Sequence, residues 1–275
     1  MVGYNKSLTV VTAYITVEKY EKVFKGFYRS IKNYVQWAEP YRLLLNPVLV
    51  YTDSDVFENH MLKLRNKTEM LTKIIRIDKE VLWPFLLKSS VEALFKIPQY
   101  PKYYPGTTYP DYTCATNSKL SILVDGLTRF KTSYYCWLDA GYLKYLRGRN
   151  KTFTLDVPKN FNQSKIGATQ ALNVSLNVTP KEIFYKQLNW IAGGLFLGVP
   201  ETILKFEKQY RNAVLRFLRR NLMAPEQQII YAMYSNEERR KHPVDVELQK
   251  YIPGSMPVPH KSPWHFLGYA MYNER

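Results

Sequence analysis

The chain has 275 residues, of which 46% are hydrophobic and 23% are charged, which is ordinary for a globular protein with a real core. Its length accommodates one large domain or two small ones. Two cysteines, Cys114 and Cys136, are too few for a disulfide framework or a structural zinc site, so we expect a buried free thiol at Cys136. No apolar run reaches the ~18 residues of a membrane span, which excludes a transmembrane helix.

The net charge of +16 favours an anionic partner, such as a nucleic acid, an acidic membrane or polysaccharide, or a phosphorylated substrate. A lysine-rich solvated surface is the alternative explanation. Aromatic residues are abundant, with 23 Tyr, 13 Phe and 5 Trp, and some of them could stack on sugar rings or bases.

The sequence begins MVGYNKS and enters a strand-like run by Leu8, which leaves no room for a signal peptide. We therefore expect a soluble, cytoplasmic protein. Glycosylation sequons indicate the lumen of the secretory pathway instead, if the natural gene has an upstream anchor. These six sequons begin at Asn5, Asn66, Asn150, Asn162, Asn173 and Asn177.

Short apolar runs alternate with amphipathic segments along the first half of the chain. The spacing predicts strands over Leu8–Ile15, Pro47–Asp53 and Ile74–Ile77, and helices over Tyr20–Tyr34 and Val56–Leu64. This alternation is typical of a mainly parallel sheet with helices on both faces. We therefore predict an α/β fold.

The next segments lead to the central strand. Glu80–Phe95 reads as a helix interrupted early by Pro84. The run Ile97–Tyr112 holds four prolines and five tyrosines, so it is interpreted as a lid or a stacking surface, with an ordered surface loop as the alternative. Thr113–Phe130 returns to helical spacing and runs into an apolar strand, Tyr134–Leu138.

Asp139 follows this strand, and the small residues Ala140 and Gly141 come next. Ligands of open α/β sheets bind outside the carboxyl ends of the strands. A carboxylate there is well placed to hold a metal, a ribose or a sugar hydroxyl. The alternative is a turn in which Asp139 only bonds a backbone amide.

The second half continues the α/β pattern. Strands are expected over Lys165–Leu172 and Trp190–Val199, a helix over Glu201–Arg220, and a further helix starting at Ala224–Gln227. The tail from residue 243 onward has little periodicity. Without a linker, repeat or composition break, residues 1–275 are predicted to form a single domain.

Several pieces in this order carry a family resemblance: TAYI, VLVYTD, the helix with Asn-Ser-Lys at 117–119, RFKTSYYCWLDAGY, IAGGLFLG and APEQQIIYAMYS. The chain resembles the WlaTC/HtrL family of proposed glycosyltransferases from about Leu8 to Tyr234. More distantly it is similar to nucleotide-sugar transferases of the GT-A type. In these a Rossmann-like half binds the nucleotide, and an Asp-x-Asp element after a central strand binds the diphosphate through a divalent metal.

The resemblance implies a GT-A-like fold and transfer of a sugar from a nucleotide diphosphate sugar, such as UDP-xylose or a UDP-hexose, to a glycan or glycoprotein hydroxyl. Residues 1–142 would bind the donor and residues 143–275 the acceptor. Asp139 and Glu226 are the catalytic candidates, the latter as the base of an inverting reaction. Donor-binding candidates are Thr12, Ala13, Tyr14, Asp53, Asn117, Lys119 and Asp139. Acceptor-binding candidates are Trp190, Gly193, Gly194 and Gln227.

The metal site departs from the family pattern. The second acid of Asp-x-Asp is replaced by Gly141, so the requirement for Mn²⁺ or Mg²⁺ is left open, with Asp139 and His265 as candidate ligands. His265 lies in Trp264–Gly268, which is similar to the His-x-x-Gly element of some retaining transferases; a surface histidine is the alternative. A complete Asp-x-Asp occurs at Asp53–Asp55, where a helix N-cap is the ordinary use of Asp55.

Two other functional classes compete with this prediction. One is a protein that binds nucleic acid or another anionic polymer, but there is no zinc-finger or RNA-recognition motif and the basic residues are dispersed, so we expect no nucleic-acid partner. The other is a noncatalytic sugar-binding module that has lost its Asp-x-Asp.

Overall fold

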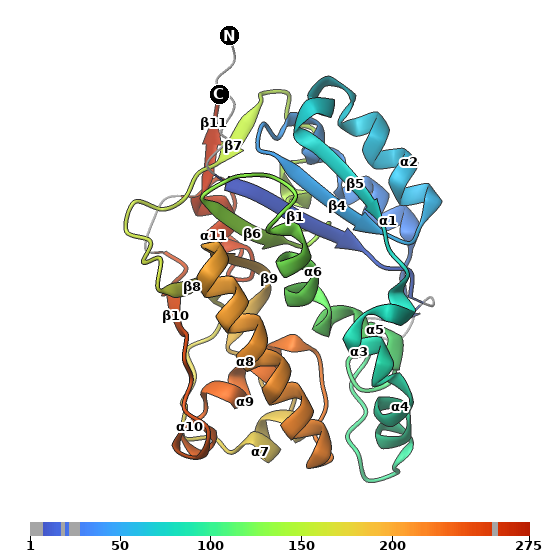
Figure 1. Ribbon diagram of the computed structural model, residues 1–275, viewed down its shortest axis with the longest axis vertical. Coiled ribbons are helices and arrows are strands. Elements are labelled where there is room, and N and C mark those ends of the chain that lie inside the picture. The colour runs from blue at the N-terminus through green and yellow to red at the C-terminus, as the bar shows by residue number, and fades with distance from the viewer. Residues whose placement is uncertain (1–7, 18–19, 22–27, 255–257) are drawn as a thin grey trace.

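The computed structural model describes residues 8–17, 20–21, 28–254 and 258–275, which form one mixed α/β domain (Figure 1). Its core is a seven-stranded sheet with the order β10-β8-β9-β6-β1-β4-β5. These strands are β1 (Leu8–Tyr14), β4 (Val48–Thr52), β5 (Thr72–Arg76), β6 (Tyr134–Leu138), β8 (Lys165–Gln170), β9 (Ile191–Gly198) and β10 (Glu247–Tyr251). Only β9 runs antiparallel to its neighbours, so the prediction of a mainly parallel sheet is confirmed.

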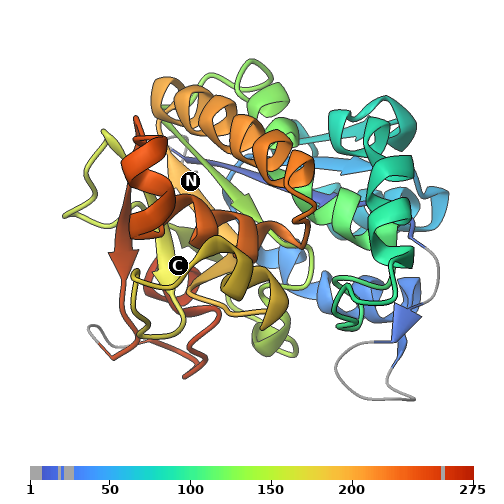
Figure 2. The same ribbon diagram turned by 90° about the horizontal axis from the view of Figure 1, so that it is seen from below.

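Helices cover both faces of the sheet (Figure 2). One apolar cluster joins the sheet to α4 (Lys88–Lys96), α6 (Lys119–Gly126), α7 (Pro180–Tyr185), α8 (Pro200–Arg219) and α9 (Glu226–Tyr234). The cluster on the opposite face includes residues of α2 (Asp55–Leu64), the 3₁₀ helices η1 (Glu39–Leu43) and η4 (Lys144–Leu146), and α11 (Phe266–Ala270). Because both faces are covered, β6 is a continuous apolar run, and β1 lacks a regular alternation of apolar and polar residues.

The remaining elements are short. The helices are α1 (Ile31–Trp37), α3 (Trp83–Leu86), α5 (Pro110–Asn117), α10 (Asn236–Lys241), η2 (Asn66–Leu71) and η3 (Lys79–Val81). Two small antiparallel pairs join β2 (Tyr20–Glu21) to β3 (Tyr28–Arg29) and β7 (Phe153–Leu155) to β11 (Tyr272–Glu274). Cys114 and Cys136 are buried free thiols, which confirms the expectation for Cys136. In the part of the chain that the structure describes, no helix is long and apolar enough to cross a bilayer.

The strand order creates a switch point between β1 and β6. The chain proceeds from β1 to β4 and β5 on one side, and then returns to add β6 on the other side of β1. The four strands thus have the order 3-2-1-4 of a doubly wound nucleotide-binding sheet, in which the ligand crevice lies where the direction of winding reverses. The residues that follow β1 and β6 therefore meet at one edge of the sheet.

The predicted helix over Tyr20–Tyr34 is confirmed only from Ile31 onward, where α1 begins. Residues 20–21 and 28–29 form the β2–β3 pair, and the helix begins only at Ile31; residues 22–27 lie outside the described part of the chain. Ser30 fixes this start, because its backbone N–H donates to Asn33 Oδ1 at 2.9 Å in a capping box. Apolar spacing alone does not show where such a cap lies, so it does not define the start of this helix.

The predicted helix over Thr113–Phe130 is two helices. The first begins earlier, with Pro110 at its first position, and it ends at Asn117. Ser118 separates it from α6, and its hydroxyl donates to the Cys114 carbonyl at 2.9 Å. Side-chain bonds of this kind compete with the backbone ladder of a helix. The segment Glu80–Phe95 is likewise divided, into η3, α3 and α4.

The C-terminal tail contains regular structure that its sequence did not indicate. It supplies the edge strand β10, which pairs in parallel with β8, as well as α11 and β11. The edge strand buries only Leu248 and Tyr251 to any great extent, so its apolar pattern is too short to be read as a strand.

Candidate functional site

A cavity of about 490 Å³ lies at the β1–β6 switch point, within the range of small-molecule sites. Its walls come from the ends of β1 and β6, from the residues just after them, and from α1, α5 and α6. The lining residues that matter below are Ala13, Tyr14, Arg29, Tyr34, Trp37, Tyr112, Lys119, Asp139, Gly141, Tyr142, Lys144 and His265. Segments distant in sequence thus form one site where the topology predicts a ligand.

Asp139 is the carboxylate that reaches this cavity. Its Oδ1 accepts hydrogen bonds from Trp137 Nε1 at 2.7 Å and from Lys119 Nζ at 2.9 Å. Its backbone N–H donates to the Gly194 carbonyl at 2.9 Å, and its side chain is 41% exposed. Within the described residues no hydrogen bond engages Oδ2. One oxygen is therefore held by the protein, and the other is available to a ligand.

Lys119 links Asp139 to the interior. Besides Asp139, its ammonium group contacts Glu226 Oε1 and the Gly193 carbonyl oxygen, each at 2.9 Å. Burial by itself lowers the pKa of Lys119, but Asp139 and Glu226 outweigh this effect and hold the pKa well above its usual value. Lys119 therefore stays charged and fixes the orientation of Asp139.

Glu226 lies behind Lys119 and is absent from the cavity lining. It is only 5% exposed, and burial raises its pKa above the ordinary value, although Lys119 acts in the opposite direction. Its second oxygen, Oε2, has no hydrogen-bond partner within the described residues. The structure therefore does not support Glu226 as a base that touches an acceptor. It can act on the cavity only through Lys119.

The glycine pair of β9 is occupied by the protein's own side chains. A Cβ atom at Gly193 would lie 1.8 Å from Glu226 Oε1, and one at Gly194 would lie 2.9 Å from the Tyr142 ring. Gly193 thus makes room for Glu226 while its carbonyl binds Lys119. The predicted contact of these glycines with an acceptor is replaced by internal packing.

Two other acceptor-binding candidates face the interior. Trp190 is 4% exposed and packs near Tyr231 and Tyr234, with ring centroids 5.9 and 5.8 Å away. Gln227 donates to the Ile191 carbonyl at 3.1 Å. Neither residue lines the cavity, so both have structural contacts in place of the predicted acceptor contacts.

The donor-binding candidates separate into two groups. Ala13, Tyr14, Lys119 and Asp139 line the cavity together. Thr12 and Asn117 are buried and absent from the lining. The Asn117 amide is bonded to Thr113 and Ala224 carbonyls and to the Tyr210 hydroxyl, so its role is to join helices rather than to bind a donor.

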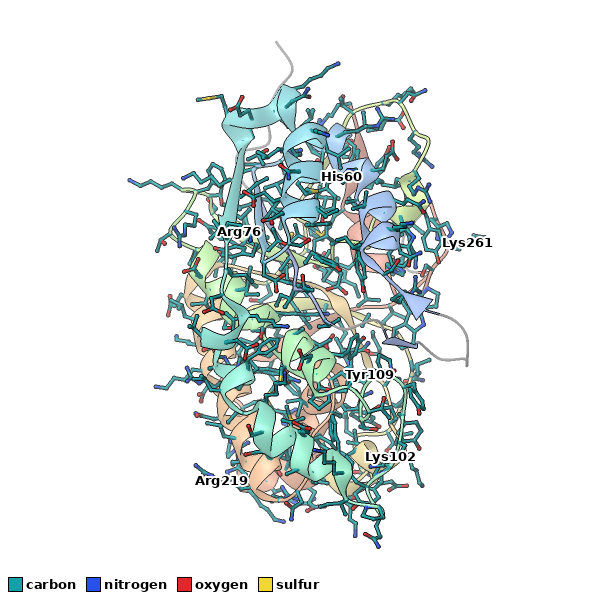
Figure 3. The ribbon with its side chains drawn as sticks, turned by 90° about the vertical axis from the view of Figure 1, so that its right-hand side faces the viewer. His60, Arg76, Lys102, Tyr109, Arg219 and Lys261 are labelled. Carbon is teal, nitrogen blue, oxygen red and sulfur yellow. The ribbon has the colours of Figure 1, made fainter. Side chains whose placement is uncertain are left out.

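The Asp53–Asp55 motif supports the site without entering it. Asp53 Oδ1 accepts from the Thr16 backbone N–H at 2.7 Å and so ties the β1 end to the β4 end. The predicted N-cap at Asp55 is corrected to Ser54, whose hydroxyl accepts from Phe57 N–H. Asp55 pairs with Arg76 at 2.9 Å on the surface; Arg76 is labelled in Figure 3.

Aromatic side chains form part of the cavity lining. Tyr14 stacks on Phe57 with centroids 5.0 Å apart and lies 5.2 Å from Tyr34, which contacts Trp37 at 5.2 Å. Burial, Tyr34 and Asp53 raise the pKa of Tyr14 to about 12, so its hydroxyl stays protonated. Of these residues the sequence analysis named only Tyr14 as a ligand contact.

His265 also lines the cavity, next to Tyr142. Its ring lies 4.8 Å from the Tyr142 ring, and its Nδ1 is 2.7 Å from Ser262 Oγ. Throughout the described ranges, no three His, Cys, Asp or Glu side chains come close enough to hold a metal together. Asp139 and His265 thus share a cavity, and metal binding by them stays a prediction.

Two cations that the sequence analysis did not single out, Arg29 and Lys144, complete the lining. Arg29 Cζ lies 4.2 Å and Lys144 Nζ 5.3 Å from the centroid of the Trp37 ring. Lys144 opens the basic stretch KYLRGRNK just after Tyr142, which was its only sequence signal. Arg29 and Trp37 had no signal, because they reach the cavity through the β3–α1 segment.

A second cavity, of about 330 Å³, adjoins the first, since Val17 and Tyr112 line both. It is formed mainly by α4 and the start of α5, and Tyr109 is among its residues. Figure 3 labels Tyr109 and Lys102 on the connection from α4 to α5. Buried Tyr100 anchors this connection through its bond to the Met223 carbonyl at 2.5 Å. The run that we interpret as a lid or a stacking surface is ordered here and places Tyr109 at a cavity, and its use as a lid or stacking surface stays a prediction.

The comparison with protein families agrees with the resemblance in the sequence. Residues 6–241 match the family described as "Bacterial protein of unknown function (HtrL_YibB)". The chain belongs to this family. No curated protein matches it. Because the HtrL_YibB description gives no activity, a function for this member has to be argued from the cavity.

Proposed function

We propose that the protein is a glycosyltransferase that moves a sugar from a uridine diphosphate sugar to a glycan hydroxyl. The observation that carries this proposal is the placement of Asp139 at the β1–β6 switch point. There one oxygen is fixed by Lys119 and Trp137, and the other faces a cavity of about 490 Å³. Open α/β sheets bind nucleotides in such a crevice.

The cavity has complementary walls for the two parts of such a donor. Tyr14 and Tyr34 form an aromatic surface against which a base can pack. Asp139 Oδ2 can accept a hydrogen bond from a hydroxyl of the ribose or the transferred sugar. Lys119 supplies positive charge beside this carboxylate without leaving its buried position.

In the reaction the bond between the anomeric carbon and the diphosphate oxygen breaks, and a bond from the acceptor oxygen to that carbon forms. The nucleoside diphosphate leaves with the bonding electron pair, and the proton of the acceptor hydroxyl passes to Asp139 Oδ2 or to the departing diphosphate. The transition state has oxocarbenium character, and fixed charges near the leaving group stabilise it. Asp139 is the carboxylate that lines this cavity.

The adjoining cavity is the proposed place for the acceptor. It shares the lining residues Val17 and Tyr112 with the donor cavity, and it offers the Tyr109 ring to a sugar. This location differs from the predicted one, because it lies within residues 1–142 rather than in the second half of the chain.

A noncatalytic nucleotide-sugar-binding protein is the second candidate. It is favoured by the presence of one carboxylate where the Asp-x-Asp pattern of GT-A type transferases has two, with Gly141 packed under Trp37. Such a protein would bind the donor without releasing UDP when acceptors are present.

Calorimetry with UDP- and GDP-sugars, with and without manganese, tests the proposal first. We expect saturable binding of at least one UDP-sugar and a matching rise in melting temperature. Release of UDP in the presence of a glycan mixture then separates transfer from binding alone. Absence of binding to every UDP- and GDP-sugar under both conditions contradicts the proposal.

A further inference from the structure

We propose that Arg29 and Lys144, together with Trp37, hold the diphosphate of the donor, and that these protein cations replace a divalent metal. This inference rests on the proposed function and assigns the subsite that neutralises the leaving group. It concerns three residues that neither the sequence motifs nor the family description identifies.

The three residues form one wall of the cavity beside the Asp139–Gly141 turn. Both cationic groups lie over the Trp37 indole, at 4.2 Å for Arg29 Cζ and 5.3 Å for Lys144 Nζ. A Cβ atom at Gly141 would lie only 2.9 Å from the same indole. Gly141 therefore lets Trp37 approach the turn that follows Asp139, and the two cations lie over this Trp37 ring.

The charges on this wall are suited to an anion. Lys144 is half-buried, and burial followed by repulsion from Arg29 lowers its pKa. Among the described residues no carboxylate forms an ion pair with Lys144, whereas many surface lysines of this chain have such a pair. A diphosphate would relieve the repulsion between the two cations, and charge-assisted bonds from Arg and Lys to phosphate are strong.

The donor atoms around Asp139 do not fit a resident divalent metal. Magnesium and manganese prefer several oxygen ligands, and the cavity lining offers a single carboxylate. That carboxylate already has an ammonium group 2.9 Å from Oδ1, which would repel a second cation. His265 is engaged with Ser262 and belongs to no cluster of three metal-binding side chains in the described ranges.

Calorimetric titrations with UDP, inorganic pyrophosphate and uridine, in EDTA and again in manganese, test this inference. We expect the wild type to bind UDP in EDTA. Lys144→Met should weaken UDP and pyrophosphate binding by roughly 10- to 100-fold, as for loss of a charged hydrogen bond, and leave uridine binding unchanged. Lys144→Arg should retain most of the affinity. Added salt should weaken UDP binding less in Lys144→Met than in the wild type.

Lys181→Met is the matched control, because Lys181 also lies over an aromatic ring, 5.4 Å from the Tyr185 centroid, but outside the cavity. An unchanged melting temperature of Lys144→Met shows that the fold is retained. Loss of UDP binding in EDTA with recovery in manganese overturns the inference, as does equal affinity of Lys144→Met and the wild type. If the wild type binds pyrophosphate but not UDP, the proposed function fails and the anion site stands; if it binds neither, both fail.

Discussion

Lys119 on α6 and Glu226 on α9 form a buried ion pair, with 2.9 Å between Nζ and Oε1. Lys119 also contacts Asp139, so one ammonium group binds two carboxylates, Glu226 inside the protein and Asp139 in the cavity. Removing a partner from a buried pair leaves an uncompensated charge, which costs far more than the loss of a surface pair. The arrangement therefore makes the geometry of the cavity depend on an interaction inside the core.

Lys119→Met should destabilise the protein strongly, because it leaves Glu226 and Asp139 without their shared cation. We expect the free energy of unfolding to fall by about 3–5 kcal/mol, measured by urea denaturation. Lys205→Met is the control, since it breaks a solvent-exposed pair with Glu201 and should have no measurable effect. Equal stability of the two variants would show that the buried pair contributes little.

The raised pKa of Glu226 predicts a pH dependence of stability. A carboxyl whose pKa is higher in the folded state binds more protons there than in the unfolded state. Glu226 therefore makes its full contribution to the free energy of unfolding below its ordinary pKa of 4.5. This contribution is lost as the pH rises through the pKa that Glu226 has in the folded state. Glu226→Gln removes this titration.

We therefore expect the stability of the wild type relative to Glu226→Gln to decline as the pH is raised from 4.5 toward 8. Urea denaturation of both proteins at several pH values measures this difference. A constant difference, or one that grows with pH, contradicts the raised pKa.

Gly193→Ala should displace Glu226, because the added methyl group would lie 1.8 Å from Oε1. We expect a marked fall in melting temperature and loss of donor binding. The double variant Gly193→Ala/Glu226→Ala tests the cause, since it removes the clashing carboxylate. Its destabilisation should be clearly smaller than the sum of the single changes, and strict additivity would mean that Gly193 acts in some other way.

Much of the fold could be read from local patterns, and less of the site. Apolar runs identified β1, β4, β6 and β9, and the position of Asp139 after a buried strand was enough to single it out. The Lys119–Glu226 contact joins residues 107 apart, and no local spacing encodes such a contact. For Trp190 the local sequence suggested a ligand contact that the structure does not have. This aromatic residue precedes a glycine pair, which suggested a sugar contact, but it lies in the core. Side-chain direction at a strand end is set by packing from distant elements.

Tyr109→Ala tests the proposed acceptor cavity. Loss of a stacking ring should raise the KM for the acceptor by roughly 3- to 10-fold and leave the KM for the donor unchanged. Tyr103→Ala is the control, because Tyr103 lies on the same connection, is 37% exposed and does not line either cavity. Similar kinetics for the two variants would exclude Tyr109 from acceptor binding.

Asp139 provides the most direct test of the active site. Asp139→Ala removes the available oxygen Oδ2 but leaves Lys119 with Glu226 and the Gly193 carbonyl, so the melting temperature should change little compared with Lys119→Met. Turnover should fall on the order of 100-fold or more, the scale for loss of one preorganised electrostatic group.

Asp139→Asn distinguishes the roles that this oxygen can have. The amide keeps an oxygen for Trp137 and Lys119 and presents an NH₂ group to the cavity instead of Oδ2. If Oδ2 only accepts a hydroxyl hydrogen bond, the NH₂ group can donate to that hydroxyl, and the loss of kcat should be mild. If Oδ2 takes a proton or binds a metal, Asp139→Asn should be nearly as damaging as Asp139→Ala. Near-normal turnover of Asp139→Ala that still saturates with donor concentration would show that the active site lies outside this cavity. Asp53 and Asp55 would then be the next carboxylates to replace.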